Sequence, residues 1–433
     1  MEHVVFFPGA DGAEAFRRAA DLEEAVRLVE SLRNDQGIGE VSVFARDASG
    51  RLRGLQCFRP TDYTPAWNKT PSSCAERALG INGAVGEVLS SDGRWLYVTS
   101  PKDDAVVSFR RDPATGMLTW ARCMQDGAAA HYFARCSHAL GLGSARWIAL
   151  SPDGRNAYVA DLDHAIATLA RDPSTGALRE IDCIKDVNDT GRDNGGVDYA
   201  YVSRCRSTGS GLWYNREIVV SPDGRSVYST DNYGYAIAEF GRDRRTGRLT
   251  QIGCVADRTS PAFTGKCTRS SSNLRWIFSL AISPDGRYLY AGGQAGQVDT
   301  FERDRSTGRL VRTACVSLPS TRARNDCSQT ASNLDDVVGL TLTPDGSGLW
   351  AVNFGPLNST AEFGLAEFAV DRATGQLAPT GCVQDAHESR DPGCAVRAEG
   401  LYGARSVAFS PDGREMYATA SVAYALSAFE LAR

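Results

Sequence analysis

Long apolar runs, clustered basic charge and histidine are all scarce in this sequence of 433 residues. No run of about 18 apolar residues occurs, so no membrane span is expected. The formal net charge is −5 and no long block of like charge exists, which argues against a nucleic-acid groove. Histidine occurs five times, and the G-x-S-x-G, H-E-x-x-H and P-loop motifs are absent. The sequence therefore shows no recognisable catalytic signature, and we expect neither a metal nor a cofactor.

Cysteine, by contrast, is abundant: twelve residues fall into six pairs, each with the same place in an internal repeat. Within a pair the second cysteine follows the first by 12 to 22 positions, and the repetition predicts six local disulfide loops. Zinc is the alternative, but no C-x2-C pair occurs. The predicted disulfides are Cys57–Cys74, Cys123–Cys136, Cys183–Cys205, Cys254–Cys267, Cys315–Cys327 and Cys382–Cys394.

These disulfides predict an oxidising compartment, and hence a secreted, periplasmic or cell-surface protein. Residues 1–8 do not read as a signal peptide, because they lack a basic region and their apolar run is too short. The expected localisation therefore rests on the cysteines alone.

The internal repeat reads S-P-D-G-R-x-x-Y, then R-D-x-x-T-G-x-L, then Cys, and it recurs roughly every 60–70 residues. Pro presets φ, Asp bonds the backbone and Gly accepts positive φ, so both motifs are typical of tight turns. Four antiparallel strands per repeat, arranged radially, are typical of a β-propeller blade. In the copy that begins at Ser151 the expected strands are 146–150, 156–160, 165–169 and 177–181.

The repeats predict an all-β fold, a β-propeller of four-stranded antiparallel blades, with six blades favoured. The chain enters and leaves in mid-repeat, so we expect residues 41–433 to form a propeller closed by pairing of its N- and C-terminal strands. Similar segments at 41–45 and 425–429 leave seven blades as the alternative. The turn aspartates that mark the six copies are Asp92, Asp153, Asp223, Asp285, Asp345 and Asp412.

Residues 1–40 differ from the repeats and are predicted to form a β-α-β appendage or cap. Residues 3–7 are apolar and β-prone, and residues 13–32 show a helical apolar period. A strand at 41–44 would complete the unit.

The run S-P-D-G-R-x-x-Y-V-A followed by F-x-R-D-P-x-T-G-x-L resembles the lactonase-like propellers, over about residues 41–433. This family includes bacterial 6-phosphogluconolactonase, fungal carboxymuconate-lactonising enzymes and exported YVTN-type repeat proteins. The resemblance implies the propeller fold and, less specifically, action on a lactone. No set of His, Glu and Arg residues aligns with the catalytic residues of the family. The disulfide loops resemble those of the exported members.

Both kinds of turn are expected on one face of the ring, and the longer, variable segments on the other, which we call the loop face. Variable loops on a rigid scaffold are where binding sites are commonly built. Asp103, Asp231 and Asn232 are candidate ligand-binding residues of this face. Besides the Cys loops, it carries residues 102–104, 161–164, 231–233, 294 and 353–362.

Three copies carry an arginine seven residues before the turn aspartate, on the strand expected to line the channel: Arg146, Arg216 and Arg405. Three guanidiniums near one axial opening suit a carboxylate or phosphate ligand. Alternatively, each arginine pairs with an acid or the backbone of a neighbouring blade. Asp335 and Asp336 lie near the same level and are possible partners, and Asp335 is also a candidate ligand-binding residue.

His164, with Asp161 and Asp163 beside it, is the best candidate for acid–base chemistry, because a loop histidine near carboxylates titrates close to neutrality. A solvated loop histidine is the simpler interpretation. The serines of the S-P-D-G motif are interpreted as turn residues rather than nucleophiles.

Two functions stay open at this point. The first is an exported, monomeric, non-catalytic propeller that binds a small anionic molecule, a glycan or a protein through its loop face. The second is a lactonase-type hydrolase or lactonising lyase (a cycloisomerase) that acts on a small carboxylated substrate. Arginines that meet an acid at an open mouth would favour the enzyme, and arginines held in salt bridges between blades would favour the scaffold.

Overall fold

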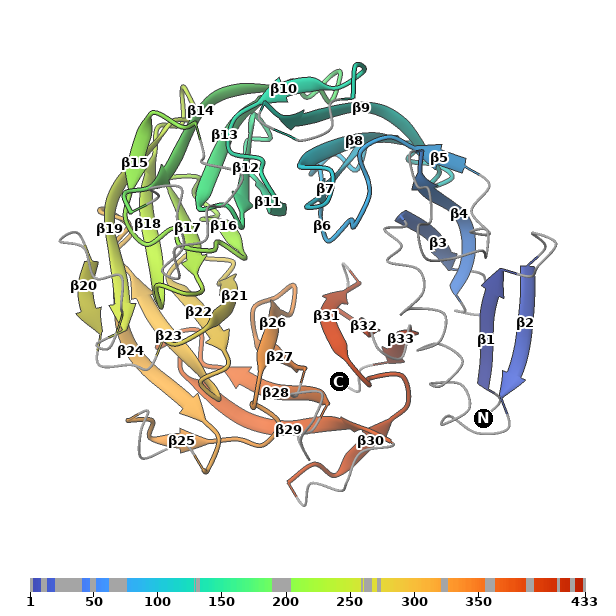
Figure 1. Cartoon of the computed structure of the whole chain (residues 1–433). Coiled ribbons are helices and arrows are strands. Elements are labelled where there is room, and N and C mark those ends of the chain that lie inside the picture. The colour runs from blue at the N-terminus through green and yellow to red at the C-terminus, as the bar shows by residue number, and fades with distance from the viewer. Residues whose placement is uncertain are drawn as a thin grey trace. The chain divides into compact units, whose positions relative to one another are not determined.

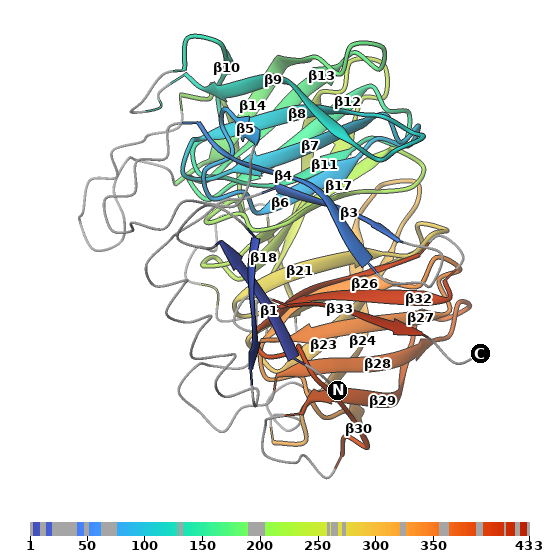
Figure 2. The same cartoon turned by 90° about the vertical axis from the view of Figure 1, so that its right-hand side faces the viewer.

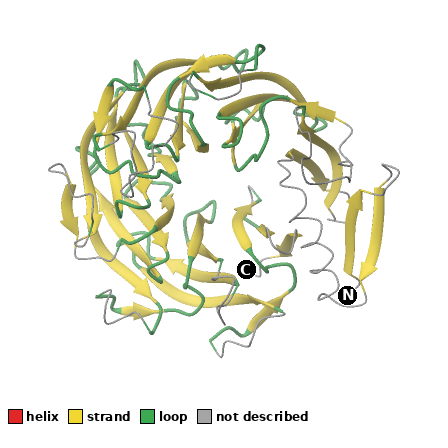
Figure 3. Ribbon diagram, viewed as in Figure 1, coloured by secondary structure: helices red, strands yellow, loops and turns green. Residues whose placement is uncertain are grey.

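The chain divides into two compact units, described separately below: residues 1–209 with 244–248, and residues 210–243 with 249–433. The described residues form strands and no helix (Figure 3), and so include no helix that could span a membrane. The computed structural model describes residues 3–8, 14–19, 41–46, 52–61, 76–127, 129, 133–188, 204–257, 260, 267–270, 274–320, 326–354, 363–386, 393–410, 413–420 and 425–430.

The first unit contains a two-stranded sheet of β1 (His3–Pro8) and β2 (Glu14–Ala19), a three-stranded sheet and two five-stranded sheets (Figure 1). The three-stranded sheet has the order β3-β4-β5, and the five-stranded sheets have the orders β10-β9-β8-β7-β6 and β11-β12-β13-β14-β15. The other strands are β3 (Val41–Arg46), β4 (Leu52–Pro60), β5 (Glu76–Ala78), β6 (Gly86–Leu89), β7 (Trp95–Ser100), β8 (Ala105–Arg111), β9 (Leu118–Asp126), β10 (Ser137–Ala139), β11 (Ala145–Leu150), β12 (Asn156–Asp161), β13 (Ala165–Arg171), β14 (Leu178–Asp186) and β15 (Ser207–Gly209).

The second unit contains three five-stranded sheets and one three-stranded sheet, each with its strands in chain order. Figure 2 shows β26, β27, β28 and β29 side by side in one of them. The strands are β16 (Ile218–Val220), β17 (Ser226–Asp231), β18 (Ala236–Arg242), β19 (Leu249–Asp257), β20 (Cys267–Ser270), β21 (Ile277–Ile282), β22 (Tyr288–Gly293), β23 (Gln297–Arg303), β24 (Leu310–Ser317), β25 (Gln329–Thr330), β26 (Val337–Leu342), β27 (Gly348–Asn353), β28 (Gly364–Val370), β29 (Leu377–Asp385), β30 (Val396–Ala398), β31 (Ala404–Phe409), β32 (Glu415–Ala420) and β33 (Ala425–Glu430).

Each sheet of five strands is one repeat, which we call a blade. The four strands expected within the copy from Ser151 are confirmed as β11 to β14, joined by antiparallel pairing. The S-P-D-G and T-G glycines have positive φ, for example 66° at both Gly154 and Gly176, as tight turns require. Each blade buries its middle strands: every residue of β12 is buried, because both faces of the sheet are covered by side chains.

A fifth strand at the outer edge of each blade was not predicted. It follows the second cysteine of a pair and runs parallel to the fourth strand, so that Cys254 lies opposite Cys267 in the β19–β20 register. The bond between the two cysteines brings the returning chain alongside the strand it has just left. The prediction of four strands per repeat missed this strand, because it spans only two to four residues and carries no repeat motif.

Five of the six predicted disulfides are present, and they indicate an oxidising compartment. Their Cα atoms lie 4.3 to 5.2 Å apart, close to the short end of the spacing usual for a disulfide. The sixth predicted pair, Cys57–Cys74, lies outside the described side chains. The five bonds are Cys123–Cys136, Cys183–Cys205, Cys254–Cys267, Cys315–Cys327 and Cys382–Cys394.

The described residues form seven blade-like sheets, five with five strands and two with three. The two segments that raised the alternative of seven blades, now β3 and β33, each belong to a separate three-stranded sheet. Counting S-P-D-G motifs favoured six, because the sheet of β3 has no such turn of its own. Closure of a ring by the terminal strands stays a prediction.

The N-terminal expectation is wrong for the part of the helix that the structure describes. Residues of the expected helix instead form β2 (Glu14–Ala19), which pairs antiparallel with β1 (His3–Pro8). A β-prone run such as His3–Pro8 needs a partner for its backbone groups, and residues 14–19 supply it. The rest of the expected helix, at 20–32, lies outside the described residues.

In four repeats the aromatic residue is a tyrosine that connects one blade to the next. In the first unit the hydroxyl of Tyr97 donates to the carbonyl of Gly176, at 3.1 Å. In the second unit Tyr290 donates to Gly375 in the same way, also at 3.1 Å. These rings are fully buried, so the S-P-D-G-R-x-x-Y tyrosine is a packing residue whose hydroxyl is satisfied by the T-G turn of the next blade.

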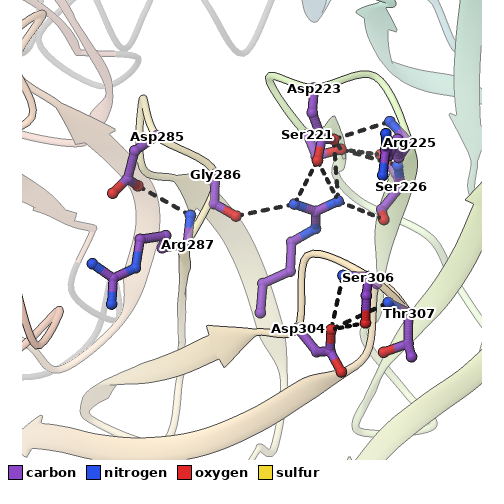
Figure 4. Close-up of polar contacts among 12 residues, drawn as sticks. Ser221, Asp223, Arg225, Ser226, Asp285, Gly286, Arg287, Asp304, Ser306 and Thr307 are labelled. Carbon is purple, nitrogen blue, oxygen red and sulfur yellow. Dashed lines mark hydrogen bonds and ion pairs between the residues drawn. The ribbon is translucent and has the colours of Figure 1, made fainter.

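The arginine of the R-D-x-x-T-G motif is a second connector. The guanidinium of Arg303 is fully buried and forms a bidentate ion pair with Asp223, with nitrogen–oxygen distances near 3.0 Å. It also donates to the carbonyl of Gly286, to the hydroxyl of Tyr228 and to Ser226. Figure 4 shows Asp223, Ser226 and Gly286 converging on this guanidinium. The turn motifs of two adjacent blades are thereby held together.

Two carboxyl groups of the blade β16–β20 accept backbone N–H groups from the next blade. Glu217 accepts from Leu280 and Glu239 accepts from Leu310, both at 2.8 Å. Burial raises the pKa of Glu217 to about 8 and that of Glu239 to about 7. Both groups therefore hold a proton in the folded protein at pH values where the unfolded chain has lost it.

The stability of the protein should accordingly fall as the pH rises from about 4.5 to 8. Over this window the folded state binds more protons than the unfolded state, so one such carboxyl lowers the free energy of unfolding by up to about 1.4 kcal/mol per pH unit. Urea denaturation at several pH values measures the slope. Glu217→Gln, whose amide oxygen still accepts from Leu280, should flatten it, whereas Glu302→Gln on the exposed side of β23 should not. An unchanged slope in Glu217→Gln contradicts this assignment.

Candidate functional site

A buried carboxyl, Asp336, lies at the start of β26 in the second unit. Its backbone is fixed on both sides: its N–H donates to Oδ1 of Asn353 at 2.7 Å, and its carbonyl accepts from the N–H of Phe354 at 2.9 Å. One carboxylate oxygen, Oδ2, accepts from the amide of Gln294 at 3.3 Å. The other, Oδ1, is buried and has no hydrogen-bond partner in the described structure. The side chain is 8% exposed, so this oxygen is available only to a group that enters beside it.

The pKa of Asp336 is raised, chiefly because burial disfavours the charged form. The amide of Gln294 and the guanidiniums of Arg216 and Arg405 act in the opposite direction, and neighbouring Asp335 adds to the rise. Two of the three predicted arginines therefore lie within electrostatic reach of one acid.

Both arginines lie against aromatic rings. The guanidinium of Arg216 is 4.3 Å from the ring centroid of Phe278, and that of Arg405 is 3.7 Å from the ring centroid of Phe354. Stacking of this kind restrains a long side chain on the face of the ring, and a planar guanidinium suits carboxylate and phosphate groups. We call Arg216, Arg405, Asp336 and Gln294 the carboxylate site.

This arrangement can perform two kinds of chemistry. Two restrained guanidiniums can bind a ligand carboxylate or phosphate through charge-assisted hydrogen bonds. A buried carboxyl with a raised pKa is in addition a candidate for proton transfer. The described side chains include no cluster of three or more His, Cys, Asp or Glu residues suited to a metal ion.

The third predicted arginine, Arg146, belongs to the first unit. It stands in β11, and its backbone carbonyl accepts from the hydroxyl of Thr99 at 2.8 Å. The convergence of three arginines therefore stays a prediction, and two of them are assigned to the carboxylate site.

His164 occupies a turn position between β12 and β13. Its backbone has φ 69° and its carbonyl accepts from the N–H of Asp186 at 2.8 Å. The side chain is 6% exposed, so the interpretation as a solvated histidine is wrong. Asp161 is also buried and caps the turn by accepting from the N–H of Ala165 at 2.6 Å, and Asp163 is partly buried. A catalytic role for these three residues stays a prediction.

The other predicted ligand residues hold the loops that carry them. Asp103 accepts from the N–H of Asn82 at 2.8 Å, and Asp231 accepts from the N–H of Gly234 at 2.6 Å. The buried amide of Asn232 donates to the carbonyl of Ile277, at 3.2 Å. Asp335 is partly buried beside Asp336. A direct role in binding is a prediction for each of the four.

Sequence reasoning weighed Asp336 only as a possible partner of the arginines, and placed Gln294 only on the loop face. It did not identify Phe278 and Phe354 as stacking partners. Phe278 could have been found, because it stands at the repeat position that Arg216 and Arg405 occupy. Buried acids at the end of the fourth strand were another omission. Asp126, Asp257 and Asp385 each accept the N–H of a leucine in the next segment, and so are structural caps.

Comparison with known proteins supports the propeller assignment. Residues 131–323 match the family model described as Lactonase, 7-bladed beta-propeller. The predicted resemblance to lactonase-like propellers is thus confirmed, and the fold is an all-β propeller of that kind. The model's seven blades agree with the seven blade-like sheets rather than with the six favoured from the sequence. No protein of curated function matches the chain.

Solved structures resemble the chain over most of its length. A Bacteroides uniformis protein thought to be a 6-phosphogluconolactonase is 20% identical, with a TM-score of 0.55 over 92% of this chain and 93% of that one. The periplasmic gluconolactonase of Pseudomonas aeruginosa is 20% identical, with a TM-score of 0.51 over 83% and 81%. A Desulfotomaculum acetoxidans protein of unknown function is 14% identical, with a TM-score of 0.56 over 92% and 90%. At these identities the likeness shows the fold alone.

Proposed function

We propose that this protein is an exported propeller that binds a small carboxylated molecule at the carboxylate site of its second unit. One observation carries the proposal: Arg216 and Arg405, from separate blades, both act on the buried carboxyl of Asp336. A ligand carboxylate bound beside Asp336 would be attracted by the same two guanidiniums. The raised pKa of Asp336 favours its neutral form, which does not repel the ligand. The five disulfides, and a periplasmic relative of the same fold, support export.

Ligand affinity should depend on pH through Asp336. Once Asp336 ionises, it competes for the guanidiniums and repels the ligand carboxylate, so affinity should fall as the pH rises through its pKa. Isothermal titration with gluconate as the probe measures this. Asp336→Asn should bind gluconate roughly tenfold more tightly above that pKa and show a flatter pH profile. Gluconate binding that is independent of pH in the wild type, or absent, contradicts the proposal.

Hydrolysis of a lactone is the second candidate function, and the raised pKa of Asp336 favours it. In that reaction the carboxylate of Asp336 accepts a proton from water as the water oxygen bonds to the lactone carbonyl carbon. The ring C–O bond then breaks, and the released oxygen takes the proton back from Asp336. The guanidiniums would stabilise the negative charge on the carbonyl oxygen.

Turnover of glucono-δ-lactone decides between binding and catalysis. An enzyme should accelerate hydrolysis above the spontaneous rate, and Asp336→Asn should remove about 100-fold or more of that acceleration. Hydrolysis at the spontaneous rate in both proteins, together with gluconate binding, leaves the binding function and excludes glucono-δ-lactone as a substrate.

A further inference from the structure

Four aromatic side chains gather on the loop face of the second unit, outside the carboxylate site. Tyr214 precedes β16, Tyr233 and Tyr235 lie in the turn between β17 and β18, and Trp276 precedes β21. Tyr233 stands between Tyr214 and Trp276, with both ring centroids 4.8 Å away and edge-to-face geometry. Tyr235 lies 5.7 Å from Trp276 on the other side. We call these four residues the aromatic platform.

The backbone of the platform adopts a conformation that bulky residues rarely take. Tyr214, Tyr235 and Trp276 have φ values of 69°, 54° and 55°. Left-handed backbone costs about 1–3 kcal/mol at each non-glycine residue. Glycine, with its freedom at positive φ, stands at Gly83 and Gly403, the positions that correspond to Tyr214 and Trp276 in two other repeats. Large rings therefore occupy turn positions that other repeats fill with glycine or, at Ser144, with serine, and this difference motivates a functional interpretation of the rings.

The exposure of the platform suits a ligand that is both apolar and polar. Tyr233 is 41% exposed, and the other three rings are partly exposed. The rings have apolar faces, and their polar atoms, phenol hydroxyls and an indole N–H, are of types that form hydrogen bonds with hydroxyl groups. The guanidinium of Arg275, 5.5 Å from the centroid of Tyr235, adds donors at the rim.

A pyranose ring matches this surface. One face of such a ring presents C–H groups that pack on an aromatic ring, and its hydroxyls project from the edge toward polar groups. A protein partner would need far more surface, because a stable interface commonly uses about 20–30 residues on each side. The platform, with four side chains, has the size of one or two sugar rings.

We propose that Tyr214, Tyr233, Tyr235 and Trp276 form a carbohydrate-binding subsite that stacks the pyranose rings of a glycan. The subsite adjoins the carboxylate site, since the backbone N–H of Gln294 donates to the carbonyl of Trp276 at 3.2 Å, but none of its four rings belongs to that site. It gives the loop face a means of attachment to glycans at the cell surface or outside the cell.

Titration with cellopentaose, chitopentaose and laminaripentaose tests the subsite. At least one should bind at concentrations up to about 10 mM and change the tryptophan fluorescence, because Trp276 is covered on binding. Tyr233→Ala should weaken binding about tenfold or more, whereas Tyr233→Phe, which keeps the ring, should bind within about threefold of the wild type. Tyr233 is exposed at the surface, so its replacement leaves the core intact.

Matched controls keep the result interpretable. Val311→Ala removes another exposed apolar side chain of the second unit, on β24, and should not affect glycan binding. Gluconate binding should be unchanged in Tyr233→Ala, so failure of this subsite and failure of the carboxylate site are distinguishable. Absence of binding by all three pentasaccharides, or unchanged binding in Tyr233→Ala, overturns the proposal.

Discussion

Replacing Arg303 by Met should lower the free energy of unfolding by about 3–5 kcal/mol, the largest stability effect we expect from a single substitution. The methionine fills much of the space of the arginine stem but provides no donors. Asp223 then loses its bidentate partner, and the hydroxyl of Tyr228 and the carbonyl of Gly286 lose one hydrogen bond each. A charge left without a partner beside buried groups costs more than the original pair contributed. Chemical denaturation, with the disulfides kept oxidised, measures the difference.

The fifth blade offers a matched control. There the position of Arg303 is taken by Val370, and an ion pair within the blade joins the turn aspartate, Asp345, to Arg372 at 2.9 Å. Both partners are about 60% exposed, so water screens the pair and Arg372→Met should cost less than about 1 kcal/mol. Equal losses in the two variants would show that burial is not what makes Arg303 important.

Replacing Arg216 by Ala should weaken gluconate binding by about 100-fold, and Arg405→Ala should have a similar effect. Each arginine can supply a charge-assisted hydrogen bond, commonly worth about 1.5–3 kcal/mol. Lysine keeps the charge but not the flat guanidinium that stacks on Phe278, so Arg216→Lys should recover only part of the affinity. Isothermal titration at low and at physiological salt separates the contact from the long-range attraction.

The control for this experiment is Arg305→Ala, which removes an exposed arginine from the turn between β23 and β24 of the same unit. It changes the net charge by the same amount as Arg216→Ala, and it should leave gluconate affinity within about twofold at physiological salt. Equal weakening by Arg305→Ala and Arg216→Ala contradicts a defined site and points to diffuse electrostatic attraction.

Local sequence was sufficient for the blades and insufficient for the connections between them. The turns could be predicted because Pro, Asp and Gly dictate backbone angles within four residues. The bond between Tyr290 and Gly375 could not, because it joins positions 85 residues apart and depends on how one sheet packs on the next. The repeats did suggest such a connection. An arginine and a tyrosine that occur in most copies are expected to have a structural role common to those copies.

The sequence likewise predicted only part of the carboxylate site. The arginines were found by comparing repeats, because Arg216 and Arg405 depart from the residues at the equivalent position. The importance of Asp336 could not be derived in this way. Its raised pKa comes chiefly from burial, and burial is a property of the packed structure. The helical period read across residues 14–19 failed for a related reason, since a free strand nearby offered those residues backbone pairing.

The short outer strands have a consequence for the behaviour of the protein in solution. β10, β15 and β30 have three residues each, and they cover strands of nine residues, β9, β14 and β29. So short a strand makes few backbone hydrogen bonds, and in each blade a disulfide at its base holds it in place. Reduction of the disulfides would allow these short outer strands to detach. The long strands would then have exposed edges whose N–H and C=O groups can pair with another chain. The cysteines therefore protect the molecule from aggregation as well as stabilising each loop, and an exported propeller would depend on them where chaperones are scarce.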